Sequence, residues 1–323
     1  MHIHDEQDTA YVTRDETDAL IAAAGRNSAD PRAGLFGPAS ITWRINRESA
    51  LFLGAGRAAL LQLAHPWVST ALQQHSTVMQ RPIARFHSTF RIVFTMIFGS
   101  LAQATAAARH LYELHTHIQG DMAEEVARWP RGSHYQANEI AALRWVYATL
   151  IESAVLAWEI VLPPLTPEEL AAYYAETKTL AALFGLPASA LPQDWKSFLH
   201  YCREMEKSDA LGVSNTARTI AHGLLAGSGS WIKPPRWYRA LTTVWLPERF
   251  RADFRLSFDA DDERALTKAR QRLPRYYRRL PSTLRFVGPW HEAQARLAGR
   301  RPGPLARASN RFWIGEPVMP FAS

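Results

Sequence analysis

The signals that start and stop helices in the first half of the chain constrain its fold most. Pro82 stands where the first turn of a helix tolerates proline, and Gly99 stands where a helix would stop. Ser100 and Gln103 form an S-x-x-Q capping box that starts a second helix, and Gly120 provides the next stop. The pattern predicts two helices, Ile83–Phe98 and Leu101–Gln119. Because the link is so short, we expect them to pack as antiparallel neighbours.

Similar signals recur through the rest of the chain, whereas alternating strand patterns are few. Thr166 opens another capped start, and the stretch Gly227–Pro235, rich in glycine, serine and proline, is the best candidate for a linker. Further helices are expected over Asn138–Ile160, 166–184, Trp195–Lys207, Ser214–Ala226 and Asp261–Leu280. The fold class is therefore all-α. We expect one multi-helix globular domain over 41–300, an N-terminal extension over 1–40 and a C-terminal tail over 301–323.

The composition is that of a packed soluble protein. Hydrophobic residues make up 47% of the chain and charged residues 21%, which excludes a disordered or fibrous protein. The single cysteine, Cys202, excludes a disulfide framework and any metal site built from cysteines alone. Residues 1–18 are polar and acidic, the opposite of a secretion signal. We therefore expect a cytoplasmic protein.

The net charge of +7 is unevenly distributed. Residues 231–323 contain 19 Lys or Arg and 8 Asp or Glu, whereas residues 1–230 contain 18 and 22. The basic third is either a solvated face of surface helices or a face for nucleic acid or an anionic membrane. No nucleic-acid motif accompanies it, so we expect no nucleic-acid partner. Contact with a membrane surface stays open.

The chain has twelve histidines and one cysteine, so histidine imidazoles are the first candidates for a metal ligand or a catalytic group. In the second predicted helix, one apolar stripe recurs at spacings of four and three: Ala104, Ala108, Leu111, His115 and Ile118. A separate, polar face carries His110, Glu113 and His117. His115 is therefore the histidine that points into the interior. It is either a core residue with satisfied hydrogen bonds or a ligand.

The first predicted helix has a matching polar pair. Arg85 and Thr89 are four residues apart and share a face, which Ile92 and Met96 continue as apolar groups. A buried arginine needs an anionic partner, and no acidic residue lies between positions 81 and 99. The partner is either a carboxylate from elsewhere in the fold or the anionic group of a ligand.

Other motifs carry less chemistry. The stretch Gly54–Arg57 lacks the third glycine of a dinucleotide fingerprint and predicts a loop that allows close packing, followed by a helix that ends at His65. For His65, a capping or hydrogen-bonding role is favoured over a ligand role. Glu152 and Glu159 share a helix face, but the Glu-x-x-His pairs of di-iron proteins are absent. A site of two histidines and one carboxylate for non-haem iron stays open.

Several stretches together resemble the DUF2236 family, which covers the MpaB-type oxygenases and the latex-clearing proteins (rubber oxygenases). The segment Leu53–Pro66, LGAGRAALLQLAHP, resembles the opening motif of that family. Further matches are Arg85-x-x-x-Thr89, Glu113–Gly120, Arg144–Leu150 and Leu280–Arg285. The resemblance runs from about Trp43 to Ala298. These ordered motifs are specific for the family and not for one reaction.

The resemblance implies an all-α fold of the latex-clearing-protein type that binds haem b and acts as an oxygenase on an apolar, unsaturated small molecule with dioxygen. His115 occupies the position of the proximal iron ligand, and Arg85 and Thr89 occupy the distal side. Arg57 and Arg91 are candidates for binding the haem propionates, on proximity in sequence alone. Two other functions stay open: a haem carrier or sensor without turnover, and a membrane-surface interaction protein that uses the basic third.

The chain also departs from the rubber-cleaving members of that family. Ser88 stands where those enzymes carry a lysine, which removes a distal ligand and puts rubber-type substrate handling in doubt. Gln119 and Gly120 replace an arginine–histidine pair, and Tyr147 stands where related short bacterial members would have a histidine. The substrate therefore need not be a polymer.

Overall fold

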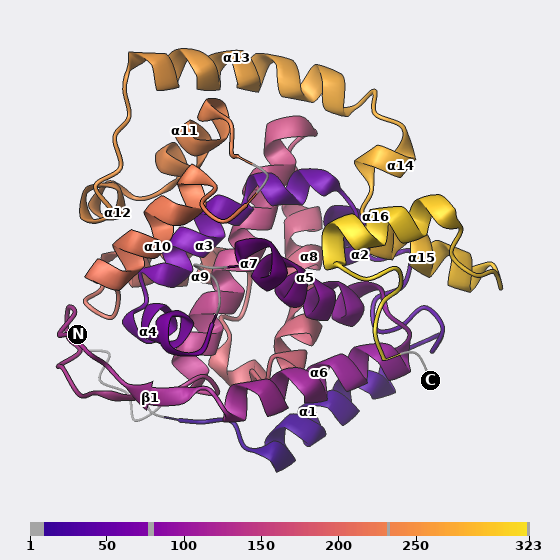
Figure 1. The fold of residues 1–323 in the computed structure, drawn as a ribbon. Coiled ribbons are helices and arrows are strands. Elements are labelled where there is room, and N and C mark those ends of the chain that lie inside the picture. Colours follow the sequence, from indigo (N-terminus) through magenta and orange to yellow (C-terminus); the bar gives the residue numbers. More distant parts are fainter. Residues whose placement is uncertain (1–9, 77–80, 231–232, 322–323) are drawn as a thin grey trace.

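The structure, a computed structural model, describes residues 10–76, 81–230 and 233–321 and is built almost entirely from helices. Figure 1 shows α5 and α7 in the middle of the molecule, with α6 and α1 along one edge and α13 along the opposite edge. The helices are α1 (Arg14–Arg26), α2 (Ile41–Asn46), η2 (Ser49–Leu53), α3 (Ala55–Leu63), α4 (Pro66–His75), α5 (Pro82–Phe98), α6 (Leu101–Thr116), α7 (Ile140–Val161), α8 (Pro167–Leu183), η3 (Ala188–Ala190), α9 (Trp195–Lys207), α10 (Asn215–Ala226), α11 (Arg236–Trp245), α12 (Glu248–Asp253), α13 (Ala260–Tyr277), α14 (Ser282–Arg285), α15 (Gly288–Leu297) and α16 (Pro304–Ile314). The all-α prediction is confirmed.

The start signals in the sequence act as expected. Ser100 accepts a hydrogen bond from the Gln103 backbone N–H, and the Gln103 side chain accepts one from the Ser100 N–H, so the capping box of α6 is complete. Thr166 and Glu169 make the same reciprocal pair at the start of α8. The two predicted helices before and after Gly99 exist and pack against each other as α5 and α6.

The second of these helices ends earlier than predicted. It stops at Thr116, because the chain then turns into a two-stranded antiparallel sheet, β1 (Gln119–Asp121) and β2 (His134–Gln136). Gly120 pairs with Tyr135, whose hydroxyl donates to the Gln74 side chain at 2.7 Å. The prediction of helix through Gln119 was wrong, since cross-strand pairing with a segment fifteen residues away satisfies these backbone groups instead.

Helix α7 is the core of the fold. Trp145 donates to the carbonyl oxygen of Leu61 at 2.8 Å, and Tyr147 donates to the Thr177 hydroxyl at 3.0 Å, so α7 is tied to α3 and α8. Among the described residues it is the one helix long and apolar enough to cross a membrane. Most of it is covered by the surrounding helices, as in the core helix of a globular fold.

The glycines before α3 allow the close packing that the sequence predicted. A Cβ atom at Gly54 would overlap the backbone carbonyl oxygen of Ser153 on α7. One at Gly56 would overlap the Thr242 hydroxyl on α11. The predicted helix after these glycines ends at Leu63, and His65 occupies the N-cap position of α4. The His65 side chain makes no capping hydrogen bond, so a capping role for it was wrong.

The predicted extension and tail both pack on the central helices. Within residues 1–40, α1 lies against α6 and α8. Within residues 301–323, α16 lies against α5 and α15, and Met319 beyond it is buried. The described parts of both segments therefore contribute to the same hydrophobic core as the central region. The predicted linker at 227–235 includes positions 231 and 232, which lie outside the described residues.

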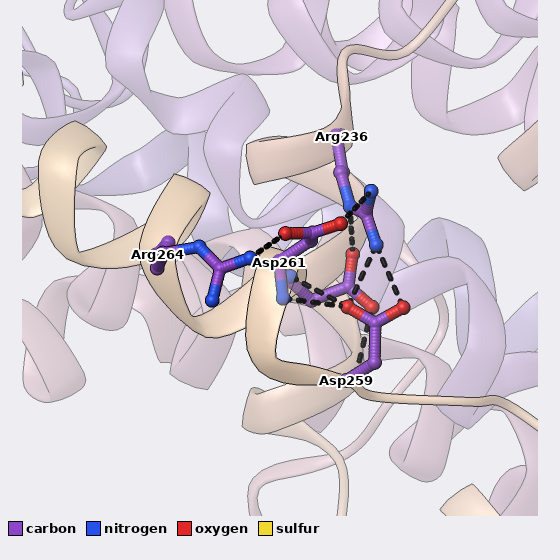
Figure 2. Close-up of polar contacts among 5 residues, drawn as sticks. Arg236, Asp259, Asp261 and Arg264 are labelled. Atoms are coloured by element: carbon purple, nitrogen blue, oxygen red, sulfur yellow. Dashed lines mark hydrogen bonds and ion pairs between the residues drawn. The ribbon is translucent and has the colours of Figure 1, made fainter.

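Helix α13 is fastened at its acidic start. Figure 2 shows Arg236 of α11 reaching the carboxylates that open α13. Its guanidinium lies 2.7 Å from Asp259, 3.3 Å from Asp261 and 2.7 Å from Asp262. Arg264 also pairs with Asp261. Negative charge at a helix N-terminus is favourable, so these acids both cap α13 and anchor it to α11.

Candidate functional site

The structure brings His115 and Arg85 together. His115 lies in the last turn of α6 and Arg85 in the first turns of α5, and the two helices are antiparallel neighbours. Burial lowers the pKa of His115 to about 4, and the nearby Arg85 charge lowers it further in the same direction. The imidazole is therefore neutral at physiological pH, which is the form that binds a metal ion.

Asn138 holds His115 in place, and the sequence analysis missed it. Asn138 is buried in the link between β2 and α7, and its side chain hydrogen-bonds His115. This contact acts on the pKa of His115 in the raising direction, against the larger lowering effects of burial and of Arg85. Asn138 is therefore a residue that bears directly on the state of the imidazole. Asn138 is far from His115 in sequence and belongs to no helical pattern, so no local signal marks it.

Arg85 is exposed to solvent, and its side-chain partner is Thr89 rather than a carboxylate. Its guanidinium donates to the Thr89 hydroxyl, which in turn donates to the Arg85 carbonyl oxygen at 3.0 Å. Among the described residues no carboxylate pairs with it, and burial lowers the pKa of Arg85. The predicted pair therefore forms, and its positive charge is not compensated by any described side chain.

Solvent reaches the surface around Arg85, Ser88, Thr89 and His115, which we call the recess. Arg85 and Ser88 are exposed, and His115 and Thr89 are half-buried. Neighbouring protein nevertheless dominates the pKa shifts of both Arg85 and His115.

Aromatic side chains on α5 pack together next to the Arg85–Thr89 pair in the sequence. Phe86 and Phe90 follow Arg85 and Thr89 directly in sequence, and their rings lie 4.7 Å apart. Phe52 packs against both, and it stacks on Trp313 with 4.3 Å between ring centroids. The first half of α5 therefore presents an apolar wall beside a cationic group.

One family model matches most of the chain. The family model described as ER-bound oxygenase mpaB/B′/Rubber oxygenase, catalytic domain, matches residues 42–295, which is most of the chain. The chain belongs to this family. No curated protein matches it, and no solved structure does.

Of the five residues predicted for the site of this oxygenase-family domain, Arg85, Thr89 and His115 lie in the recess, whereas Arg57 and Arg91 do not. Arg57 is buried on α3 and holds Glu152 at 2.7 Å and Glu206 at 3.2 Å, and it also donates to Ser153 at 3.1 Å. Its charge is thus neutralised within the fold, and Glu152 serves this ion-pair cluster.

Arg91 and His65 also lie apart from the His115–Arg85 pair. Arg91 on α5 donates to the Ile314 carbonyl oxygen at 3.1 Å and lies 3.6 Å from Glu316, so it binds the C-terminal segment. His65 is buried beside Trp67 and Trp129. Burial, and then the charge of Arg128, lower its pKa to about 3, so it is neutral.

Two further observations bear on this oxygenase-family site. Among the described residues, no three His, Cys, Asp or Glu side chains form a metal-binding group. A separate open pocket of about 390 Å³ lies at the start of α10 and contains none of the predicted residues. Its arginines, Arg218 and Arg249, already donate to backbone carbonyl oxygens. The recess between α5 and α6 is therefore the candidate active site.

Proposed function

We propose that the chain is a haem b-dependent oxygenase that oxidises an apolar small molecule with dioxygen. His115 would hold the haem through its iron, and Arg85 and Thr89 would supply hydrogen bonds to the oxygen that the haem activates. The observation that carries the proposal is the pair itself. A neutral imidazole and an uncompensated guanidinium lie near each other on antiparallel helices, in a recess that solvent reaches.

The residues present fit a haem. A haem iron needs one protein ligand, because the porphyrin supplies the equatorial ones, and His115 is one accessible neutral histidine. The Asn138 amide fixes its tautomer and ring orientation, as the partners of metal-binding histidines generally do. Arg85 supplies a cation without a protein counter-ion, suited to an anionic oxygen in the site.

Each side chain then has a stated task. Haem supplies the binding and activation of dioxygen when it is bound. Arg85 donates hydrogen bonds to negative charge that develops on oxygen, where a fixed cation in a water-poor site stabilises it most. Thr89 holds the guanidinium in position through its hydroxyl. Phe86 and Phe90 bind the apolar substrate and keep water away.

A visible spectrum tests haem binding. The protein supplemented with haem is expected to show a Soret band, and His115→Ala is expected to lose it, because the only proposed axial ligand is gone. His110→Ala is the matched control, since His110 is exposed on the same helix. A Soret band that survives His115→Ala, or no band in the unaltered protein, would contradict the proposal.

Turnover is tested separately from haem binding. A haem carrier would need His115 to bind the iron but would not need Arg85, because it catalyses no reaction. Oxygen consumption with unsaturated lipids or terpenes is expected to fall at least tenfold in Arg85→Gln, by analogy with the loss of one charge-stabilising donor. Arg26→Gln, the same substitution at an exposed arginine on α1, is the control. If Arg85→Gln binds haem and consumes oxygen as the unaltered protein does, the carrier function replaces the oxygenase.

A further inference from the structure

The excess positive charge of the chain is concentrated after the start of α13. Residues 264–323 contain 13 Lys or Arg and only 2 Asp or Glu, whereas residues 1–263 contain 24 and 28. One of those two acids, Glu292, is buried and bonded to Asn310 and the Met319 N–H. The acids at the start of α13 are themselves engaged by Arg236 and Arg264 (Figure 2). Of the acids that open α13, Asp259, Asp261 and Asp262 are thus already paired, and Glu263 is the last acid before the basic residues that follow.

Those basic residues form one exposed surface, which we call the basic face. It comprises the outward side of the second half of α13 and the turn into α14, with six exposed basic residues: Lys268, Arg270, Arg272, Arg275, Arg278 and Arg279. Residues 268–285 contain no acidic residue. The seventh cation, Arg285, is half-buried and paired with Glu48 at 2.7 Å. Figure 1 shows α13 at the outer edge of the molecule.

Large apolar side chains are exposed on the same face. Tyr276 and Leu284 are each 64% exposed and Leu280 is 38% exposed, and they alternate with the arginines. The neighbouring helix α16, which contacts α14, adds Leu305 at 73% and Phe312 at 48%. These two residues are seven apart and share one helix face. Inward, Tyr277 anchors the segment by donating to Glu48 at 2.9 Å.

We propose that the basic face docks onto the surface of an anionic lipid bilayer. The argument is complementarity of charge and polarity: exposed cations attract anionic headgroups, and exposed aromatic and aliphatic side chains interleaved with them enter the interface between headgroups and acyl chains. A nucleic acid would be held by the cations and would leave Leu280 and Leu284 without partners. The bilayer accounts for both kinds of side chain.

Helix α16 links the basic face to α5, because it contacts α14 on one side and α5 on the other. The His87 imidazole on α5 donates to the backbone carbonyl oxygen of Phe312 on α16 at 2.9 Å, and His87 is two residues from Arg85. Trp313 stacks on Phe52 beside the aromatic wall. A bilayer at this face would therefore lie beside the helix that lines the recess, where an apolar substrate would be dissolved in lipid. Docking itself does not depend on the proposed oxygenase activity.

Co-sedimentation of the full chain with vesicles tests the proposal. The unaltered protein is expected to bind vesicles that contain phosphatidylglycerol, not vesicles of phosphatidylcholine alone, and to dissociate as salt is raised. Each basic residue near an anionic surface strengthens binding roughly fivefold. Arg272→Gln combined with Arg275→Gln and Arg279→Gln should therefore weaken binding about 100-fold. The matched control removes three exposed cations elsewhere: Arg26→Gln, Arg131→Gln and Lys196→Gln.

A second variant, Tyr276→Ser with Leu280→Ser and Leu284→Ser, keeps every charge and separates a bilayer from a nucleic acid. Loss of vesicle binding in this variant supports insertion at the interface. All three altered sets of side chains are exposed, and circular dichroism and Tm would confirm folding. The proposal is overturned if the unaltered protein does not bind anionic vesicles, or if the basic-face triple variant and its matched control bind them equally well. It is also overturned if the serine variant binds as tightly as the unaltered protein. An RNA or DNA oligonucleotide that binds instead, with the serine variant unaffected, overturns it in favour of nucleic acid.

Discussion

At the scale of single residues, the site depends on groups whose protonation is set by burial. His115 and His65 are both neutral because the protein around them disfavours an imidazolium, and each lies near an arginine that adds to the effect. They differ in their contacts. Asn138 orients His115, whereas His65 is packed among tryptophans and its Nδ1 is buried without a hydrogen bond in the described structure. Equal burial therefore serves a site in one case and packing in the other.

The first prediction concerns Asn138. Asn138→Ala should weaken haem binding about 10- to 100-fold and shift the Soret band, because the imidazole loses the acceptor that orients it. Titration with haem, followed by the visible spectrum, measures both. Asn46→Ala is the control, since Asn46 is also buried and donates to a backbone oxygen, that of Thr42, at 2.9 Å. Equal spectra for the two variants would show that Asn138 does not act on the ligand.

The second prediction concerns His65 and acid stability. Its pKa is about 3 in the folded chain against an ordinary value of 6.5, so the unfolded chain takes up a proton first as the pH falls. The stability that neutral His65 contributes is full above pH 6.5 and is lost as the pH falls toward 3. His65→Leu should remove this pH-dependent contribution. The free energy of unfolding should then fall by about 2 kcal/mol less between neutral pH and about pH 4.5 than it does in the unaltered protein. Urea unfolding at both pH values measures it, and an unchanged difference would contradict the assignment.

At the scale of elements, the fold depends on two kinds of contact between helices. The first is close backbone approach, where glycine before α3 lets it meet α7. The second is the buried ion-pair cluster, in which Arg57 of α3 joins Glu152 of α7 to Glu206 of α9. Both contacts fix α3 and α7 beside each other. They lie outside the recess, so changes there test the fold and not the proposed chemistry.

Gly54→Ala should destabilise the protein by about 1–3 kcal/mol, because the added methyl group would overlap the Ser153 carbonyl oxygen and push α3 away from α7. Gly25→Ala in α1 is the control. A Cβ there meets only the Leu101 side chain at 3.7 Å, and alanine favours a helix, so stability should stay the same or rise. Urea unfolding of both variants decides whether the close approach at Gly54 matters.

Glu206 should make stability depend on pH in the opposite sense to His65. Burial, and then the charge of Glu152, raise its pKa to about 7, so the folded chain holds a proton that the unfolded chain loses above about pH 4.5. Stability from this group is therefore lost as the pH rises toward 7. In Glu206→Gln, the free energy of unfolding should fall by about 1–2 kcal/mol less between about pH 5 and pH 8 than in the unaltered protein. Urea unfolding at both pH values measures this difference. Glu204→Gln, on the same helix and exposed, should change nothing.

At the scale of the whole molecule, the fold surrounds the recess with elements from distant parts of the chain. Helix α5 contacts α6, α8, α15 and α16, so the partly exposed site lies among elements from both halves of the chain, beside the C-terminal segment. A ligand bound there would contact several elements at once. Binding should therefore stabilise the whole fold.

Addition of haem should raise Tm by several degrees, because a ligand that binds only the folded state shifts the unfolding equilibrium. At a hundredfold excess over Kd the gain is about 2–3 kcal/mol. His115→Ala should show no rise, whereas His110→Ala should respond as the unaltered protein does. Differential scanning calorimetry with and without haem measures it. A rise in the His115 variant equal to that of the unaltered protein would show that haem binds elsewhere.

The sequence determined what depends on neighbours three and four residues apart. The capping boxes and glycine stops predicted α5, α6, α8 and α9 closely, and the apolar stripe of α6 pointed His115 inward. The same spacing paired Arg85 with Thr89. These inferences succeed because helix geometry alone places such residues on one face.

Only the tertiary structure decided which helix meets which. The strand pairing that ends α6, the bond from Asn138 to His115 and the capture of Arg57 by Glu152 and Glu206 all join residues far apart in the sequence. No periodicity encodes such contacts, because each depends on how whole helices pack. The candidate residues could therefore be predicted from the sequence. Whether an arginine is paired with a carboxylate, as Arg57 is and Arg85 is not, depends on how the helices pack.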